Sequence, residues 1–207
     1  MSDSDTAVLC LGEARAWTAA RRIATMLVTL IAASMSFASM AAAHSRGCPA
    51  AHTTIAHASR ADLQRAVVCL IDEQRHSRGL PGLRENARLN RSAQGWTNVM
   101  VTHRDFSHGA DFAARISAVG FNWSNVGENI ATGYSTPSAV VKAWMASKGH
   151  CQNILNPVYR YVGTGVSNDS ISGYSTLDGT WTQDFGLLMG QHAASGNWGP
   201  AEGCPYT

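Results

Sequence analysis

Two histidines and one glutamate stand out in the sequence because each lies beside aromatic residues or glycines. His108 follows Phe106-Ser107, Glu128 lies in the segment Gly127-Glu128-Asn129-Ile130, and His150 ends the segment Trp144 to His150. Neutral imidazoles with a carboxylate suit a zinc-type ion that keeps one position open for water. They also suit general acid–base chemistry. If the three segments converge in the fold, they form a polar cleft capable of one of these two functions.

The spacing of these residues does not select between the two functions. His103 and His108 do not have the i, i+4 spacing of a helical zinc site, and the chain lacks both the H-E-x-x-H helix and the G-x-S-x-G turn. A serine hydrolase would have to use Ser107 or Ser147 with His150 and Glu128. Ser147 lies only three residues before His150, at what reads as a helix end. We therefore assign no catalytic residue from the sequence.

The cysteines predict disulfide bonds. Cys10 lies in a segment that we expect to be removed, which leaves Cys48, Cys69, Cys151 and Cys204. An even number in an exported chain indicates disulfides, with three possible connectivities. No pair has the C-x-x-C spacing of a zinc knuckle, so a structural metal is the poorer interpretation. Because termini fray unless they are tied down, we predict that Cys48 pairs with Cys69 and Cys151 with Cys204.

The first 43 residues are typical of a secretory signal peptide. Arg21 and Arg22 precede an apolar run, Ile23 to Met40, which ends in three alanines. A membrane-spanning helix needs about 20 predominantly apolar residues, and this run contains several serines and threonines. The run is therefore a poor membrane-spanning helix, and an uncleaved anchor is the less favoured alternative. We expect cleavage near Ala43 and a secreted protein.

Charge limits the classes of partner that we expect, and length limits the number of domains. Without residues 1–43 the chain carries 13 basic and 11 acidic residues, with no cluster of either sign. This balance gives no electrostatic reason to expect a nucleic acid or an anionic membrane as partner. The length suits one domain with a single core, and we expect a monomer.

Apolar residues at helical spacing predict four helices in the first part of the chain. The first opens at Ser59, where Asp62 completes a pattern like a capping box, and stops at Gly79. Two more follow over residues 89–100 and 112–119, and the fourth starts at Thr136-Pro137.

Strand patterns dominate the later part of the chain. Residues 161–166 and 181–187 read as strands, and a shorter strand is expected over residues 126–131. Helices first and strands last indicate an α+β fold with a small sheet packed against helices.

Seven motifs occur in the order found in bacterial CAP-domain proteins, over roughly residues 62–188. They are G-L-P-G-L at 79–83, F-S-H at 106–108, G-E-N-I at 127–130, W-M-A-S-K-G-H at 144–150, N-I-L-N-P at 153–157, V-G-T-G-V at 162–166 and W-T-Q-D-F-G at 181–186. The chain thus resembles the CAP superfamily of cysteine-rich secretory, antigen 5 and pathogenesis-related 1 proteins, in its bacterial, SCP-like extracellular branch.

The resemblance implies a three-layer α-β-α sandwich with a small, mostly antiparallel sheet and an open cleft. Two histidines and acidic residues line that cleft, and they map to His108, Glu128 and His150. Animal and plant relatives usually carry a second glutamate where this chain has Ser147, and a hydroxyl is a poor metal ligand and a poor base. The implied organisation is a signal peptide (1–43), a lead-in (44–58), the CAP domain (59–190) and a tail tied by a disulfide (191–207).

A non-catalytic binding module is the function that the resemblance favours, because CAP domains are associated with sterols, fatty acids, divalent metals and protein partners. We expect a lipid-like or sterol-like small molecule, or an extracellular protein or envelope component, as the partner. His108 and His150 would hold zinc or another divalent metal weakly. An extracellular hydrolase, either metal-assisted or of the serine–histidine type, is the alternative.

Overall fold

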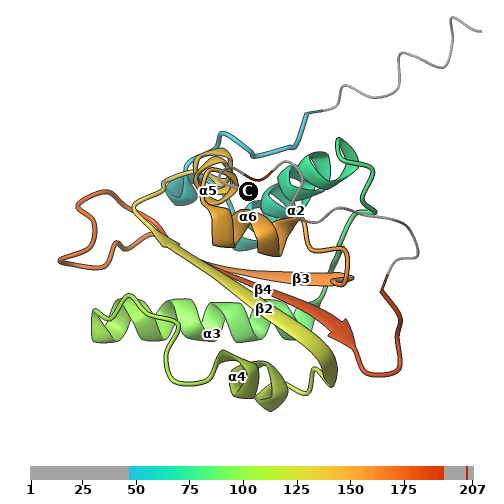
Figure 1. Ribbon diagram of the computed structural model, residues 1–207. Helices are drawn as coiled ribbons and strands as arrows, with labels where there is room; N and C mark the ends of the chain where they lie inside the picture. Colours follow the sequence, from blue (N-terminus) through green and yellow to red (C-terminus); the bar gives the residue numbers. More distant parts are fainter. Residues whose placement is uncertain (1–46, 194–203, 205–207) are drawn as a thin grey trace, which may run out of the picture. The chain divides into compact units, whose positions relative to one another are not determined.

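A four-stranded sheet lies between two layers of helices in the computed structural model, which describes residues 47–193 and 204. Figure 1 shows α2 (Arg60–His76), α5 (Pro137–Met145) and α6 (Lys148–Ile154) on one face of the sheet. The other face carries α3 (Ala87–His103) and α4 (Phe112–Ala118). The α+β fold with three layers is therefore confirmed. The predicted signal peptide, residues 1–43, lies outside the described residues.

The sheet is mostly antiparallel, as predicted. Its strands are β1 (Arg84–Glu85), β2 (Trp123–Thr132), β3 (Tyr161–Ser167) and β4 (Thr180–Leu188), in the order β1-β3-β4-β2. The short β1 runs parallel to β3, whereas β4 pairs antiparallel with both of its neighbours. This order makes β4 an inner strand and β2 an outer strand, and β2 carries Glu128.

Helix starts agree with the capping residues in the sequence. The Asp62 N–H donates to the Ser59 hydroxyl at the start of α2, over 3.1 Å. The hydroxyl of Thr136 caps α5 by accepting from the Ala139 N–H, and Pro137 occupies the first helical turn. Side-chain oxygens accept from orphan amide groups in this way at helix starts. The first helix ends at His76, before the predicted Gly79, which lies in the following turn with φ of 74°.

Helix α6 was not predicted, because the residues between Ser147 and His150 were interpreted as the end of the preceding helix. It spans only seven residues, and so short a segment forms no stable helix alone. Tertiary contacts stabilise it, because Cys151 and Ile154 are buried in the core and Cys151 forms a disulfide with Cys204. None of the helices in the described part of the chain is long and apolar enough to span a membrane.

Both predicted disulfides are present. Cys48 is bonded to Cys69 on α2, and Cys151 on α6 is bonded to Cys204. Each bond ties a residue near one end of the chain to a helix of the same layer. Constraining the unfolded chain in this way typically stabilises a protein by about 2–4 kcal/mol.

Arg75 is fully buried in α2 and links three segments of the chain. Its guanidinium donates to the carbonyls of Pro81, Ile154 and Asn156 over 2.7–2.9 Å. Burial lowers the pKa of Arg75 to about 10, so the side chain stays charged at neutral pH. Two of these carbonyls lie at the C-terminal end of α6, where the helix dipole favours a cation. Arg75 therefore fixes the end of α6 against α2.

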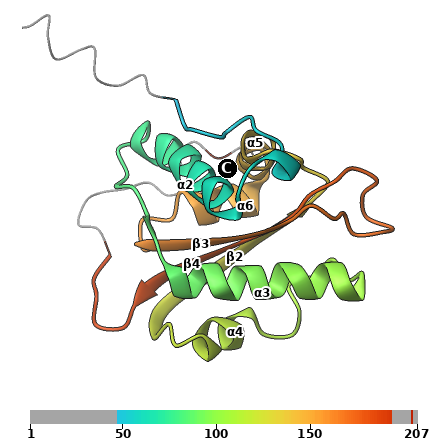
Figure 2. The same ribbon diagram turned by 180° about the vertical axis from the view of Figure 1, so that it is seen from behind.

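Helix α3 lies directly on β3, across the face seen in Figure 2. A Cβ atom at Gly163 would lie 2.5 Å from the Cβ of Leu89, and one at Gly165 would lie 2.5 Å from the backbone N of Gln94. Real Cβ atoms do not approach other atoms so closely, so only glycine permits this packing. The two glycines of the V-G-T-G-V motif are therefore required by the spacing between α3 and the sheet.

We expect Gly163→Ala to destabilise the fold by about 1–3 kcal/mol or more, because the methyl group must push α3 away from β3. Gly95→Ala is the matched control, since Gly95 is an exposed residue of α3 with no atom within 4 Å of an added Cβ. The control should gain up to about 1 kcal/mol from helix propensity. Urea unfolding of the three proteins measures both changes, and equal stability of Gly163→Ala and the natural protein would contradict this account of the packing.

Candidate functional site

Glu128 lies in the middle of β2, and its side chain is almost completely buried, with 1% exposed. One carboxylate oxygen lies 2.8 Å from Nδ1 of His108, and the other accepts from Nη2 of Arg115 over 2.6 Å. A buried carboxylate needs such partners, because an unpaired charge loses its hydration without compensation. Both oxygens are therefore already engaged within the protein.

Arg115 also holds the loop that carries His108. It donates to the His108 carbonyl over 2.9 Å, and its guanidinium carbon lies 3.8 Å from the centre of the Trp96 ring. The Trp96 indole N–H in turn donates to the Ser107 carbonyl over 2.9 Å. Trp96, which is partly exposed, is thus a platform for the guanidinium cation. This arrangement leaves the imidazole of His108 half-exposed.

His150 approaches the same strand from the opposite layer. Its backbone carbonyl accepts from the side-chain amide of Asn129, which follows Glu128 in β2. Asn153, one turn further along α6, donates to the side chain of Asn129 over 2.9 Å and to the carbonyl of Glu128 over 3.1 Å. Successive strand residues face opposite sides of a sheet. Glu128 therefore contacts His108 on the face of the sheet that α3 and α4 cover, while Asn129 contacts α6, the helix of His150, on the opposite face.

His150 is half-buried, and this burial lowers the pKa of its imidazole, with the nearby His108 adding to the effect. The imidazole is therefore neutral at physiological pH, in the form that can accept a hydrogen bond or bind a metal. The two predicted histidines are close enough to interact electrostatically. The carboxylate lies on the His108 side.

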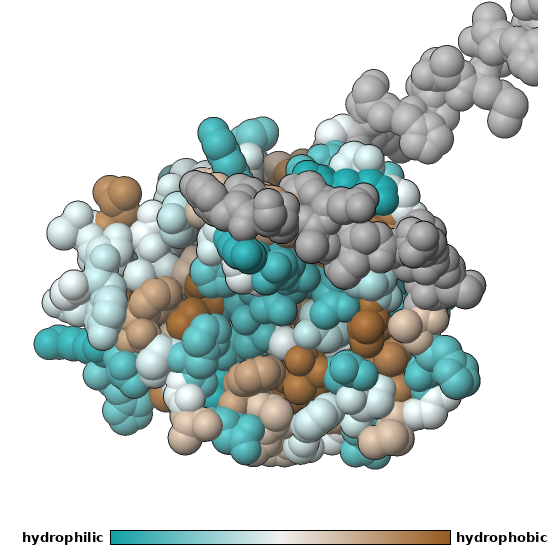
Figure 3. Space-filling model, viewed as in Figure 1, coloured by the Kyte–Doolittle hydropathy of each residue, from teal (hydrophilic) through white to brown (hydrophobic). Residues whose placement is uncertain are grey.

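A groove of about 310 Å³ opens beside His150 along the outer edge of β2. It is lined by Phe106, Ile130, Ala131, Thr132, Tyr134, Ala143, Trp144, Ser147, His150 and Tyr174. Ser147, predicted as a cleft residue, is the N-cap residue of α6, but its hydroxyl forms no capping hydrogen bond. Figure 3, which views the side of the molecule where β2 runs in front, shows hydrophilic residues in the middle of this face and separate hydrophobic patches around them.

Asp184 is the residue that sequence reasoning missed. It lies directly opposite Glu128 in the β2–β4 register and is completely buried. No hydrogen bond within the described part of the chain reaches either of its carboxyl oxygens. Burial and the neighbouring charge of Glu128 raise the pKa of Asp184 well above its ordinary value, while Ser92 and Arg115 act in the opposite direction. The D in W-T-Q-D-F-G was the available signal, because an acidic residue inside a buried strand is uncommon.

Ser107 and Ser147 are not arranged as nucleophiles. The Ser107 hydroxyl donates to Asp105 and accepts from the Gly109 N–H, so it stabilises its own loop. Within the described residues, no hydrogen bond joins the Ser147 hydroxyl to His150. A nucleophilic serine requires contact with its base, and within the described residues neither hydroxyl is hydrogen-bonded to His108, His150 or Glu128.

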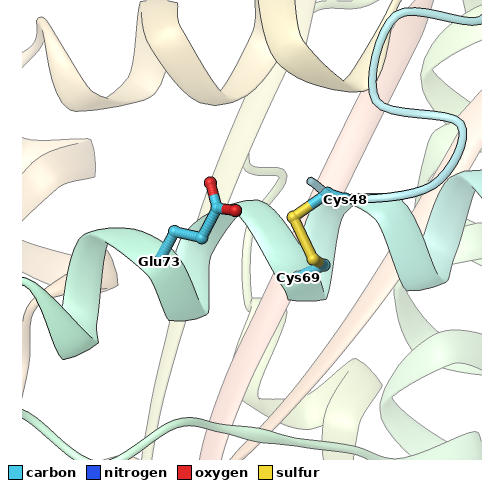
Figure 4. Close-up of side chains that lie close together, drawn as sticks. All are labelled: Cys48, Cys69 and Glu73. Atoms are coloured by element: carbon cyan, nitrogen blue, oxygen red, sulfur yellow. A yellow bond between two sulfur atoms is a disulfide. The ribbon is translucent and has the colours of Figure 1, made fainter. Parts of the chain in front are cut away.

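Potential metal ligands from three residues come together at one place in the described part of the chain, at Cys48, Cys69 and Glu73. Figure 4 shows that the two sulfur atoms are bonded to each other. A disulfide has no thiolate to offer, and metal binding by cysteine requires the thiolate. This group is therefore a covalent link and does not form a metal site.

Comparison with known proteins agrees with this architecture. Residues 68–185 match the model of the CAP family, described as the cysteine-rich secretory protein family. The chain belongs to the CAP family. The match begins within α2 and ends within β4, and it includes His108, Arg115, Glu128, His150 and Asp184.

Among CAP relatives, the uncharacterized protein YkwD of Bacillus subtilis (strain 168) is 37% identical over 139 residues, which are 64% of this chain and 50% of YkwD. This chain therefore spans about half the length of that relative. An extracellular protein of Bacillus anthracis containing an SCP domain has a similar structure, with a TM-score of 0.53, 24% identity and coverage of 62% of this chain and 44% of that one. An outer surface protein of Borrelia burgdorferi has a TM-score of 0.51 at 20% identity, covering 57% and 87%.

Asp184→Asn should change how the stability of this CAP domain depends on pH. The unfolded chain releases the Asp184 proton near pH 4, whereas the folded protein keeps it to higher pH, so the unfolded state binds fewer protons and natural stability falls as pH rises. Asparagine has the same shape and no proton to lose. We therefore expect the variant to gain on the natural protein by up to about 1.4 kcal/mol per pH unit above pH 4, until the native pKa is reached.

Urea unfolding at a series of pH values measures this difference. Asp178→Asn, at an exposed aspartate in the turn before β4, is the matched control and should leave the pH dependence unchanged. Parallel curves for Asp184→Asn and the natural protein would show that Asp184 is ionised in the folded state.

Proposed function

We propose that this protein is an exported CAP domain that binds a small, partly apolar molecule in the groove beside His150 and does not act as an enzyme. The groove carries the proposal, because it combines four aromatic side chains with a polar end made by Ser147 and His150. Ligand sites are typically apolar concavities with a few placed polar groups. The lipid-like or sterol-like character of the ligand is inferred from the family, and an extracellular protein or envelope component is the alternative partner.

The walls of the groove differ in burial. On one side Trp144 is buried, and its indole N–H donates to the Ile130 carbonyl. On the other side, Tyr174 is 57% exposed and packs on Phe106 with ring centres 5.5 Å apart. The volume is at the low end of the usual range for small-molecule sites, about 300–1,000 Å³. The groove therefore suits a short apolar segment better than an entire long-chain lipid.

Two observations support an extracellular location. Two disulfides tie down the described domain, and disulfides persist in oxidising compartments. The relatives from Bacillus anthracis and Borrelia burgdorferi are described as extracellular and as an outer surface protein. A signal peptide over residues 1–43, cleaved near Ala43, would deliver the chain to such a compartment.

A hydrolase has less support, because within the described residues neither Ser107 nor Ser147 is hydrogen-bonded to His108, His150 or Glu128. A weak metal site fits the histidines better. Nδ1 of His108 is taken by Glu128, which leaves Nε2 of His108 and one nitrogen of His150 as donors. Glu128 would then orient a ligating imidazole, as carboxylates commonly do beside metal sites, without itself binding the ion. Two protein ligands fall short of the three or four of a tight zinc site, so the ion would be held weakly.

Filling the groove should abolish ligand binding. Ala143 lines the groove from α5, and Ala143→Trp places a large side chain inside it. We expect at least about a tenfold loss of affinity, equivalent to 1.4 kcal/mol, for palmitate or cholesterol sulfate measured by calorimetric titration. Met189→Ala, at an exposed residue beyond the far end of β4, is the control and should bind as the natural protein does. Unchanged binding by Ala143→Trp would show that the groove is not the site.

Zinc binding should depend on both histidines. Calorimetric titration of zinc should show weak binding to the natural protein, loss in the His108→Ala/His150→Ala double variant, and loss at acidic pH, where protonated imidazoles cannot ligate. His103→Ala/His192→Ala changes two exposed histidines and should bind as before. Equal affinity in all three proteins, or none, would exclude the metal site and leave the groove proposal intact.

A further inference from the structure

The two outer edges of the sheet are completed differently by the surrounding side chains, and the pairing of the strands shows which backbone groups face outward. The Gly186 carbonyl of β4 accepts from the Arg160 N–H, so the backbone groups of Gly186 point towards β3. Just beyond β2, the Gly133 N–H donates to the Gly179 carbonyl, so this N–H points towards the β4 side. Backbone direction alternates along an antiparallel strand. The even-numbered residues of β2 therefore direct both backbone groups away from β4.

Side chains from the layer above occupy the outward carbonyls of β2. The Val126 carbonyl accepts from the Tyr159 hydroxyl over 3.1 Å, and the Glu128 carbonyl accepts from Asn153 over 3.1 Å. The Ile130 carbonyl accepts from the Trp144 indole over 3.3 Å. A sheet edge closed in this way is protected against pairing with another strand.

At the opposite edge of the sheet, side chains form hydrogen bonds with both the outward N–H groups and the outward carbonyls of β3. Thr164 donates its N–H to Asn90 over 2.8 Å and receives a bond from Gln64 over 2.7 Å. Val166 exchanges two hydrogen bonds of 3.0 Å with the side-chain amide of Gln94. Donors and acceptors are thus both satisfied beyond the short β1.

The outward N–H groups of β2 lack that completion. Within residues 47–193 and 204, no acceptor is bonded to the outward N–H of Ile130 or Thr132. Ile130 is only 5% exposed, and buried N–H groups are rarely left unpaired. Both residues line the groove, and their N–H groups, two residues apart along a strand, are separated by about 6.6 Å.

We propose that the backbone N–H groups of Ile130 and Thr132 form the polar anchor of the groove and that each of them binds one acyl oxygen, either of a carboxylate or of an amide carbonyl. Because donors about 6.6 Å apart cannot share one oxygen, a ligand with a single acyl group occupies one of the two at a time. The apolar body attached to that group would pack between Phe106, Tyr174 and Trp144. This inference rests on the proposed function, because it names the chemical group that the groove recognises.

The ligand's chemistry follows from the donors and from what surrounds them. Backbone N–H groups can only donate, so the bound atom must be an acceptor. The groove has no lysine or arginine in its lining, so a full negative charge is not required. An extended peptide added as a further strand is disfavoured, because the outward carbonyls of Glu128 and Ile130 already accept hydrogen bonds.

Titration of the ¹⁵N-labelled protein with three small probes of similar length tests the anchor. Hexanoate offers a carboxylate, N-butylacetamide offers an amide carbonyl, and protonated hexylamine offers no acceptor. We expect hexanoate or N-butylacetamide to bind at least tenfold more tightly than hexylamine and to shift the amide proton of Ile130, of Thr132 or of both downfield. The amide protons of Asn129 and Ala131, which face β4, should shift much less.

The outcomes separate the anchor from the groove itself. A response to hexanoate only or to N-butylacetamide only supports the anchor and identifies the acyl group that it prefers. Binding that shifts the indole N–H proton of Trp144 but neither of the two amide protons overturns the anchor and leaves the groove proposal standing. Ala143→Trp should abolish all shifts, and shifts that persist in this variant, or no binding by any probe, overturn both.

Discussion

The burial of β4 on all sides is the constraint on which the rest of the structure depends. This strand has a neighbour on each edge and a helical layer on each face, and every residue from Thr180 to Leu187 is buried. Its polar side chains must therefore find partners inside the protein. Thr182 meets Thr97 of α3, Gln183 meets Asn129 of β2, and Asp184 lies opposite Glu128. Glu128 and Asn129, both buried, continue this polar layer onto β2, the strand at the edge of the sheet.

The alternation of side chains along β2 explains how one strand serves both helical layers. Glu128 is directed towards α4 and the loop of His108, whereas Asn129 is directed towards α6 and His150. A shift of one residue in the β2–β4 register would exchange these two faces and separate the histidines from their partners. Other contacts act at a greater distance from the site. The glycines of β3 set the position of α3 against the sheet, and the buried guanidinium of Arg75 sets the end of α6 against α2.

Cap residues and periodic apolar residues predicted the long helices and the main strands well. Ser59, the Thr136-Pro137 pair and the aromatic and β-branched residues of segment 181–187 carry strong local signals, since capping and strand propensity act over a few residues. Local signals failed for α6 and for the two-residue β1. Their stability comes from a disulfide, from core contacts and from pairing with a strand far away in the sequence, which no short window contains.

The sequence by itself determined the family, the fold class, the two disulfides and the segments that carry His108, Glu128 and His150. Motif order, cysteine number and periodicity are properties of the chain before it folds. Only the tertiary structure decided that both oxygens of Glu128 are engaged, that Arg115 holds the His108 loop, and that Asp184 lies opposite Glu128. These contacts join residues from different elements, and strand register sets the Glu128–Asp184 pair. The raised pKa of Asp184 and the direction of the edge amides follow from that register and from burial, and neither can be read from residue identity alone.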